Sequence, residues 1–377
     1  MIGLFETSTW AVMPTLKKLA ITNLRNISEA ELSPALGFNL FCGANGSGKT
    51  SVLEAIHLLA LGRSFRSHLQ KPVIKDGEKT TIIYGETSDA QTLGVQRFLR
   101  GPQVIHLNGK KPNSVASLTR SLPLQLINSA TFQILEGGPR ERREFVDWGV
   151  FHVEQPFFGY WRSAKVALLN RNNLLKAGAS FAEIEPWSIE LSKSALQIDF
   201  LRAAYVAELK VELEALLEVF LNQELRKKFQ FSYWRGWNPE LDLLQRLEFD
   251  LSKDRRYGFT TSGPHKADLH FQFDGIDAAD ILSRGQLKLF ICALKIAQSR
   301  LLYRSTDQHC IFLIDDLPAE LDAVNREKVC TLLAELQDQI FISSIEEESL
   351  LPSILSGSQK WMSQVKVFHV KHGTINN

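Results

Sequence analysis

The feature that most constrains this chain is a glycine-rich loop that ends in a lysine and a threonine. Residues 43–50 read Gly-Ala-Asn-Gly-Ser-Gly-Lys-Thr and fit the pattern G-x-x-x-x-G-K-[ST]. The loop follows an apolar run at Phe38–Cys42, which predicts a strand, and leads into Lys49–Leu61, which predicts a helix. Glycines let successive backbone N–H groups point at phosphate oxygens, and the helix N-terminus adds further donors. The sequence therefore predicts a phosphate-binding loop in an α/β fold.

The loop predicts ATP and Mg²⁺ as its ligands. The Lys49 ammonium is expected to reach the β- and γ-phosphates as a point charge, and the Thr50 hydroxyl to ligate Mg²⁺. The predicted ATP contacts are Gly43, Ala44, Asn45, Gly46, Ser47, Gly48, Lys49, Thr50 and Ser51.

A second motif, far downstream, supplies acidic side chains. The apolar run Ile311–Ile314 predicts a buried strand, and Asp315 and Asp316 follow it directly. We expect Asp315 to give the second Mg²⁺ contact. Asp316 is expected to hold or deprotonate the attacking water, a role worth about 10²–10⁴ in rate. The predicted catalytic residues are therefore Asp316 and Lys49.

The long interval between these motifs contains a segment that resembles the L-S-x-G-Q signature of ABC ATPases. It reads Ser283, Arg284, Gly285 and Gln286, directly after a leucine. In ABC ATPases such a segment forms a second anion site that closes over ATP held by a partner head. The acidic segment 320–322, with Asp322 as its last residue, resembles the D-loop that crosses the dimer interface. The resemblance implies an ATP-dependent homodimer, in which each bound nucleotide strengthens the association.

The order of the segments predicts an ABC-type ATPase head, of the α/β class, with an inserted, mainly α-helical domain. Runs at 80–86, 94–99 and 104–107 predict a small antiparallel sheet beside the nucleotide site. An apolar stripe over 191–220 predicts a long helix that pairs with a helix at Phe157–Lys176. The expected division is a possible extension at 1–12, a first head lobe at 13–128, a helical insertion at 129–250 and the rest of the head at 251–377.

Composition narrows the setting without identifying a partner. The net charge is +1, so nucleic acid would have to bind through local basic clusters. The four cysteines include no Cys-x-x-Cys pair, which favours a reducing cytoplasm over a disulfide framework or a zinc site. No run approaches 18 apolar residues, so we expect no association with a membrane.

Longer local motifs resemble the RecF family of recombination mediator ATPases, whose heads are related to SMC heads. The order of these motifs matches over nearly the whole chain. They read LGRSFR at 61–66, GGPRERREFVD at 137–147, RNNLLK at 171–176 and TSGPHKAD at 261–268. The resemblance implies ATP-dependent dimerisation, weak DNA-stimulated ATP hydrolysis and binding to duplex or gapped DNA. It also implies recombinase loading at gapped or stalled replication sites, with RecO and RecR type proteins as partners.

Some residues depart from related patterns. Residues 341–344, Phe-Ile-Ser-Ser, hold no switch histidine of the kind found in ABC transporters, and Asp316 is shorter than the usual catalytic glutamate. Both departures predict slow turnover, as in a timing switch. Gln125 and Gln133 are alternative positions for a Q-loop. His265, with no second ligand at i+4, is predicted to be structural.

Four basic residues of the first lobe are the preferred candidates for DNA contacts: Arg63, Arg66, Lys110 and Lys111. Phosphate contacts of this kind would give sequence-independent, salt-sensitive binding. The linear sequence shows no platform of interleaved aromatic and basic residues. A transporter subunit, a small-molecule kinase and an SMC-like tether are the competing interpretations. The helical insertion and the signature segment oppose the first two, and the short arm favours a compact clamp over a tether.

Overall fold

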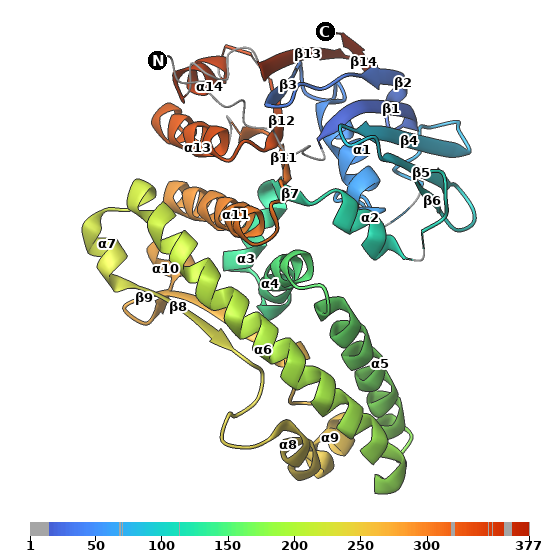
Figure 1. Cartoon of the computed structure of the whole chain (residues 1–377), viewed down its shortest axis with the longest axis vertical. Coiled ribbons are helices and arrows are strands. Elements are labelled where there is room, and N and C mark those ends of the chain that lie inside the picture. Colours follow the sequence, from blue (N-terminus) through green and yellow to red (C-terminus); the bar gives the residue numbers. More distant parts are fainter. Residues whose placement is uncertain are drawn as a thin grey trace, which may run out of the picture. The chain divides into compact units, whose positions relative to one another are not determined.

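The computed structural model describes residues 15–67, 69, 71–112, 114–317, 321–345, 347–348, 350–357 and 364–376. The chain forms two compact units: one holds the residues up to Ser129 and from Asp307 onward, and the other is Ala130–Thr306. In Figure 1 the ribbon is coloured along the sequence, so the residues of each unit can be followed by their colour. The possible extension at 1–12 lies outside the described residues.

One sheet of the first unit is antiparallel, as predicted. Its strand order is β2-β1-β4-β5-β6. The strands are β1 (Leu16–Leu24), β2 (Ile27–Leu32), β4 (Thr80–Thr87), β5 (Thr92–Phe98) and β6 (Val104–Leu107). After β6 the chain reverses at Asn108 and Gly109, whose φ angles are 52° and 71°. Both residues are thus left-handed, as a two-residue hairpin turn requires.

The second sheet of this unit carries the predicted phosphate loop. Its order is β14-β13-β3-β12-β11-β7, and every pair is parallel except β13 with β14. The strands are β3 (Phe38–Cys42), β7 (Leu124–Ile127), β11 (Ile311–Ile314), β12 (Gln339–Ser344), β13 (Val365–Lys371) and β14 (Thr374–Asn376). All residues of β3, β11 and β12 are buried, which suits central strands of a parallel sheet. The carboxyl ends of these three strands therefore meet at one edge.

Helix α1 (Lys49–Leu61) joins the two sheets into one core. Nearly all its side chains are buried, and they pack against β1, β4 and β5 on one sheet and β11 and β12 on the other. The helix ends at Gly62, whose φ of 63° gives a left-handed cap. This unit also holds α2 (Val115–Ser121), which packs on α1, and the helices α13 (Ala323–Glu335) and α14 (Leu351–Gly357), which pack on each other. The first turn of α1 is thereby fixed at the sheet edge where β3 ends.

The second unit is mainly helical. Its long helices are α4 (Pro139–Val153), α5 (Phe157–Lys176), α6 (Phe181–Phe220) and α11 (Arg284–Thr306). Helices α5 and α6 form the predicted antiparallel pair, seen in Figure 1. A capping box at Ser180 and Glu183 starts α6. Short elements complete the unit: α3 (Gln133–Glu136), α7 (Gln223–Lys228), α8 (Leu243–Phe249), α9 (Leu251–Tyr257), α10 (Ala278–Ile281), β8 (Phe229–Trp234), β9 (Asp268–Phe273) and β10 (Ile276–Asp277).

The expected boundary between residues 250 and 251 falls inside this second unit. Strand β9 pairs with β8 rather than with the strands of the head, and α11 packs on α4 and α6. Arg142 on α4 also binds Asp268 at the start of β9, at 2.6 and 3.0 Å. Sequence periodicity reveals that strands resume after Phe249, but it does not reveal which strands they pair with. Across the described part of the chain, no helix combines the length and the apolar character needed to span a membrane.

Candidate nucleotide-binding site

The loop between β3 and α1 has the backbone that its glycines permit. Gly46 and Gly48 have φ angles of 76° and 122°, which side chains with a Cβ rarely adopt. At Gly43 a Cβ would collide with the carbonyl oxygen of Val370 on β13. The Lys49 ammonium donates to the carbonyl oxygens of Gly43 at 2.7 Å and Ala44 at 3.0 Å, which closes the loop around its own lysine.

Lys49 faces both acidic residues of the second motif. Burial lowers the pKa of Lys49, and the negative charges of Asp316 and then Asp315 oppose that shift. Its amine nitrogen makes hydrogen bonds to carbonyls rather than a salt bridge to either acid in the described structure. A phosphate can therefore replace those neutral partners without breaking an ion pair.

The two motifs meet through Thr50 and Asp315. The Thr50 hydroxyl donates to Asp315 Oδ1 at 2.9 Å, although the residues are 265 positions apart. Ser343, at the end of β12, donates from its hydroxyl to the same oxygen at 2.7 Å. The Ser343 hydroxyl also accepts the Asp316 backbone N–H at 2.9 Å. Strand β12 lies between β3 and β11, so the strand order brings these three side chains together.

Ser343 is a site residue that the sequence reasoning missed. The segment 341–344 stood out only because it lacks a histidine. A hydroxyl at the end of an apolar strand was the available signal, because the carboxyl ends of adjacent parallel strands meet at one edge. Of the two Q-loop alternatives, Gln125 is buried within β7 and Gln133 begins α3. Neither lines the cavity described next.

A cavity of about 390 Å³ opens above the loop. Its lining holds most of the predicted contact residues together with residues from the turn between β1 and β2. They are Arg25, Asn26, Asn45, Gly46, Gly48, Lys49, Thr50, Ser51, Arg66, Asp315, Asp316, Ser343 and Ile345. Gly43, Ala44 and Ser47, the other predicted contacts, belong to the loop but do not line the cavity.

Asn26 holds the phosphate loop in place. Its side-chain nitrogen donates to the carbonyl oxygens of Ser47 at 2.9 Å and Gly46 at 3.2 Å, and its Oδ1 accepts from the Ser51 hydroxyl at 3.3 Å. Its turn is tight, since both Asn23 and Arg25 have a φ of 54°. The sequence assigned Asn26 no role, because nothing in the linear order places this turn beside residues 46–51.

A buried acid, Glu54 on α1, organises the arginines at the rim. Arg25 donates two hydrogen bonds to its carboxylate, at 2.7 and 2.8 Å, and Arg66 lies 3.7 Å from it. Arg66 therefore lies at the cavity. Arg63, Lys110 and Lys111 are exposed and do not line it.

The signature-like segment begins α11 in the second unit. The Ser283 N–H donates to Gln286 Oε1 at 2.9 Å, and the Gln286 N–H donates to the Ser283 hydroxyl at 3.3 Å. This reciprocal pair is a capping box at the start of α11, where Ser283, Arg284 and Gly285 are exposed. Arg284 is also exposed and makes a surface ion pair with Glu136 at 2.8 Å. In the described part of the chain, and apart from the chain neighbours of Gly285 and its own helix backbone, no atom lies within 4 Å of the position that a Cβ on Gly285 would occupy.

Asp322, the residue of the D-loop-like segment, caps α13. Its two carboxylate oxygens accept from the Asn325 backbone N–H at 2.8 Å and the Asn325 side chain at 2.9 Å. The bond from the backbone is the main reason that the pKa of Asp322 is lowered. The carboxylate is otherwise exposed, and the preceding residues 318–320 lie outside the described residues.

These features define a class of protein. A phosphate loop between β3 and α1, an acidic pair after β11 and a helical unit inserted between β7 and β11 make this an ABC-type ATPase head. Solved structures share the fold. The chain is 24% identical to the protein in "Structure of the recombination mediator protein RecF-ATP in RecFOR pathway", covering 98% of this chain and 99% of that one, with a TM-score of 0.84. An Smc head bound to the C-winged helix domain of ScpA is 14% identical, with 96% and 97% covered and a TM-score of 0.57.

Sequence comparisons give the family. A family model described as the RecF/RecN/SMC N terminal domain matches residues 15–375. "DNA replication and repair protein RecF" of Pseudomonas aeruginosa (strain LESB58) is 41% identical over 367 residues, 96% of this chain and 97% of that protein. The protein of the same name from Shewanella denitrificans is 41% identical over 364 residues, with 96% and 99% covered. The chain belongs to the RecF family, as its local motifs predicted.

Proposed function

We propose that this chain binds ATP and Mg²⁺ in the cavity, dimerises around the nucleotide on duplex or gapped DNA, and hydrolyses ATP slowly. In this proposal it promotes recombinase loading in DNA repair and replication restart, in the cytoplasm, with RecO and RecR type proteins. The observation that carries the proposal is the meeting of Thr50, Asp315 and Ser343 beside the Lys49 loop. Relatives named for DNA replication and repair, and a RecF structure titled with ATP, support it.

The residues present fit a magnesium ion. Thr50 and Asp315 bring a hydroxyl and a carboxylate oxygen within 2.9 Å of each other at the cavity. Mg²⁺ prefers such oxygen ligands, with one or two carboxylates and the substrate phosphates completing the set. When bound, Mg²⁺ would neutralise charge on the β- and γ-phosphates. Ser343 would then hold the Asp315 carboxylate in position.

In this proposal, Asp316 acts on the attacking water. It lines the cavity, and its backbone N–H is held by Ser343. Its φ of 61° is left-handed, a conformation that costs most residues about 1–2 kcal/mol but that Asp and Asn tolerate better. Here an aspartate therefore suits the backbone, although its shorter side chain reaches less far than a glutamate. A slow hydrolysis step follows from that shorter reach.

In this proposal, the signature segment of one copy completes the ATP site of the other copy. The residues that line the cavity all belong to the first unit, whereas Ser283 and Gly285 lie exposed in the second. A glycine in a helix costs up to about 1 kcal/mol relative to alanine. Among the described residues, neither a positive φ nor a close neighbour requires glycine at position 285. Close approach of another molecule, such as a nucleotide held by a second copy, gives the missing reason.

Gly285→Ala should therefore separate stability from assembly. The free energy of unfolding is expected to stay unchanged or rise by up to about 1 kcal/mol, because alanine favours a helix. ATP-driven dimerisation should weaken by at least about tenfold, a loss of about 1.4 kcal/mol of association free energy. Urea denaturation and sedimentation measure the two quantities.

Gly159→Ala is the matched control, because Gly159 also lies exposed in the first turn of a helix with nothing in the described structure within 4 Å of its Cβ position. Equal dimerisation of both variants would contradict the role of Gly285.

The main test is sedimentation of the wild type and Ser283→Arg with ATP, ADP or no nucleotide, with and without duplex DNA. Only ATP should drive the wild type to a dimer, and DNA should sediment with that dimer. Ser283→Arg should still bind ATP but remain monomeric, because the bulky cation obstructs the second anion site. A wild-type protein that binds ATP and stays monomeric would sink the proposal.

Mixing two defective variants tests whether the site is shared between copies. Ser283→Arg and Lys49→Ala should each fail to dimerise alone. In a mixed dimer, one ATP site receives the intact Lys49 of one copy and the intact Ser283 of the other. Partial recovery of the ATP-driven dimer is therefore expected on mixing. If each site used residues of a single copy, the mixture would show no recovery.

A further inference from the structure

One end of the helical unit carries exposed aromatic rings among cations. Figure 1 shows α8 and α9 beside the turn that joins α5 to α6. At the end of α9, Tyr257 and Phe259 are 50% and 43% exposed, and their rings stack at 5.7 Å with an interplanar angle of 20°. We call this surface the aromatic–basic tip and define it by Lys176, Lys253, Arg255, Arg256, Tyr257, Phe259 and Lys266.

The cations of the tip come from three segments that the fold brings together: the end of α5, helix α9 and the turn at Pro264–Lys266. The Arg256 guanidinium lies 5.1 Å from the centre of the Tyr257 ring, and the Lys266 ammonium lies 5.1 Å from the centre of the Phe259 ring. The side chain of Lys176, at the end of α5, packs at Gly258. Arg255 donates to the carbonyl oxygen of Ala179, in the turn before α6, at 2.7 Å. Five of the seven tip residues lie within residues 253–259, a signal that the sequence reasoning missed, whereas tertiary structure adds Lys176 and Lys266.

The positive charge of the tip is not neutralised locally. Within the described residues, none of its five cations has a carboxylate oxygen within 4.0 Å of its charged nitrogens. The neighbouring acids Asp250 and Asp254 are buried and engaged elsewhere, Asp250 by Arg246 and Asp254 by Arg171. Apart from the bonds of Arg255 to Ala179 and of Arg256 to the Tyr257 hydroxyl, the charged N–H groups of the tip are available to an anion from outside.

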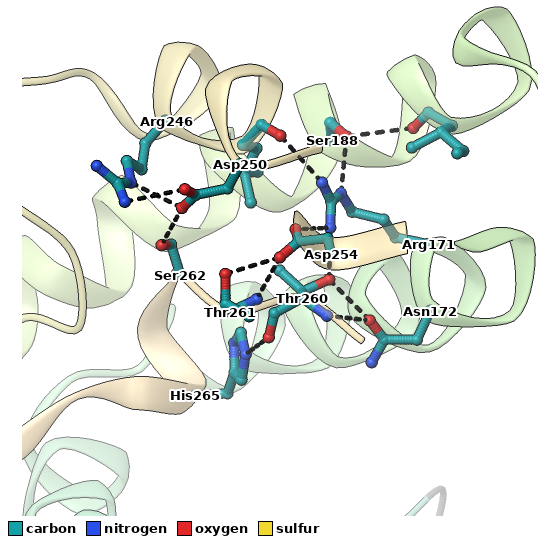
Figure 2. Close-up of polar contacts among 12 residues, drawn as sticks. Arg171, Asn172, Ser188, Arg246, Asp250, Asp254, Thr260, Thr261, Ser262 and His265 are labelled. Atoms are coloured by element: carbon teal, nitrogen blue, oxygen red, sulfur yellow. Dashed lines mark hydrogen bonds and ion pairs between the residues drawn. The ribbon is translucent and has the colours of Figure 1, made fainter. Parts of the chain in front are cut away.

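A buried network holds the tip in shape, as Figure 2 shows. Arg171 is fully buried and donates to Asp254 Oδ2 and to the Thr260 hydroxyl, both at 2.7 Å. Asp254 Oδ1 accepts from the Thr261 backbone at 3.0 Å and from its hydroxyl at 2.7 Å. Asn172 Oδ1 accepts the Thr260 N–H at 2.8 Å. The residues directly after Phe259 are therefore pinned to α5 and α9.

His265, which the sequence predicts to be structural, belongs to the same region. Its Nε2–H donates to the carbonyl oxygen of Thr260 at 2.9 Å, and burial lowers the pKa of the imidazole to about 4. A neutral ring is thus kept beneath the tip. A surface whose backbone is fixed in advance loses little conformational entropy when a ligand binds.

We propose that the aromatic–basic tip binds single-stranded nucleic acid, with unpaired bases stacked on Tyr257 and Phe259 and phosphates held by the surrounding lysines and arginines. The inference rests on the proposed function, in which the chain binds duplex or gapped DNA. Base stacking on exposed rings requires an open base face, which a duplex hides and a single strand presents. An acidic protein partner would contact the cations, but it would not explain why two aromatic rings are stacked and exposed among them. Because every base has such a face, the binding is independent of sequence.

The first experiment compares three DNAs that share one duplex, using fluorescence anisotropy of the full chain with a slowly hydrolysed ATP analogue. One duplex has no tail, one has a tail of about ten thymidines, and one has a tail of about ten abasic deoxyribose phosphates. The thymidine tail should strengthen binding at least about fivefold over the abasic tail, because only thymidine can stack. Equal affinity for the two tails overturns the proposal, since the tip would then act through charge alone.

Tyr257→Ala/Phe259→Ala should remove the advantage of the thymidine tail and leave affinity for the untailed duplex within about twofold, because stacking is lost and the phosphate contacts stay. Phe200→Ala is the matched control, since Phe200 is a 69% exposed aromatic on α6 outside the tip. It should keep the advantage. Lys253→Ala/Arg256→Ala should reduce the salt slope for the tailed DNA by about 1.4.

The outcomes separate this inference from the proposed function. If the duplex binds and the thymidine tail adds nothing, the inference fails while the proposed function stands. If neither tailed nor untailed duplex binds, both fail. If the double aromatic variant keeps its preference for the thymidine tail but loses binding to a RecR type protein, the tip is a protein-binding surface and the inference is overturned.

Discussion

Asp316→Asn is expected to lower the rate of ATP hydrolysis about 10²–10⁴-fold, while ATP binding and ATP-driven dimerisation persist. Asparagine matches aspartate in shape and tolerates the left-handed φ of 61° at this position, so the local backbone should not change. It cannot accept a proton from water at neutral pH, which removes the proposed role. Single-turnover phosphate release measures the rate, and sedimentation measures the dimer, which should also last longer.

Asp315→Asn is the matched comparison for the neighbouring acid. Asp315 accepts hydrogen bonds from Thr50 and Ser343, so its loss should weaken Mg²⁺-dependent ATP binding rather than the hydrolysis step alone. Asp316→Asn should therefore lower the rate of hydrolysis and leave ATP binding intact, whereas Asp315→Asn should lower the affinity for ATP with Mg²⁺. Hydrolysis at the wild-type rate by Asp316→Asn would contradict the assignment of Asp316 as the group that acts on water.

Arg171→Leu is expected to destabilise the helical unit by about 3–5 kcal/mol, the usual cost of removing one partner of a buried ion pair. Both Arg171 and Asp254 are fully buried, so the substitution leaves a carboxylate without its cation and out of reach of water. The Ser188 hydroxyl and the Leu247 carbonyl oxygen lose a donor as well. Urea denaturation followed by tryptophan fluorescence reports this unit, which contains Trp148, Trp161, Trp187, Trp234 and Trp237.

A second substitution tests the cause of that loss. Arg171→Leu/Asp254→Asn removes the unpaired charge but keeps an amide oxygen for the Thr261 donors, so at least about 1 kcal/mol should return. ATP binding should not change in either variant, because the cavity lies in the other unit. A loss below about 1 kcal/mol for Arg171→Leu would show that the network contributes little to stability.

Most of the nucleotide site was predictable because its chemistry is local. The residues from Phe38 to Leu61 are consecutive, and strand, loop and helix each follow from glycine positions and apolar spacing. The apolar run before Asp315 likewise marks a buried strand, and two such strands in one parallel sheet end at the same edge. The hydrogen bond between Thr50 and Asp315 is what that reasoning expects.

The remaining site residues depend on contacts that no short segment encodes. Asn26 reaches the loop from the turn between β1 and β2, and Ser343 reaches Asp315 because β12 lies between β3 and β11. Residues 251–306 join the helical unit because β9 pairs with β8, and the aromatic–basic tip gathers cations from segments up to 90 positions apart, Lys176 and Lys266 among them. Hydrophobic periodicity predicts which residues form a strand or a helix and which face is buried. Strand order and helix packing decide which distant residues contact that face. These contacts from distant segments complete the site.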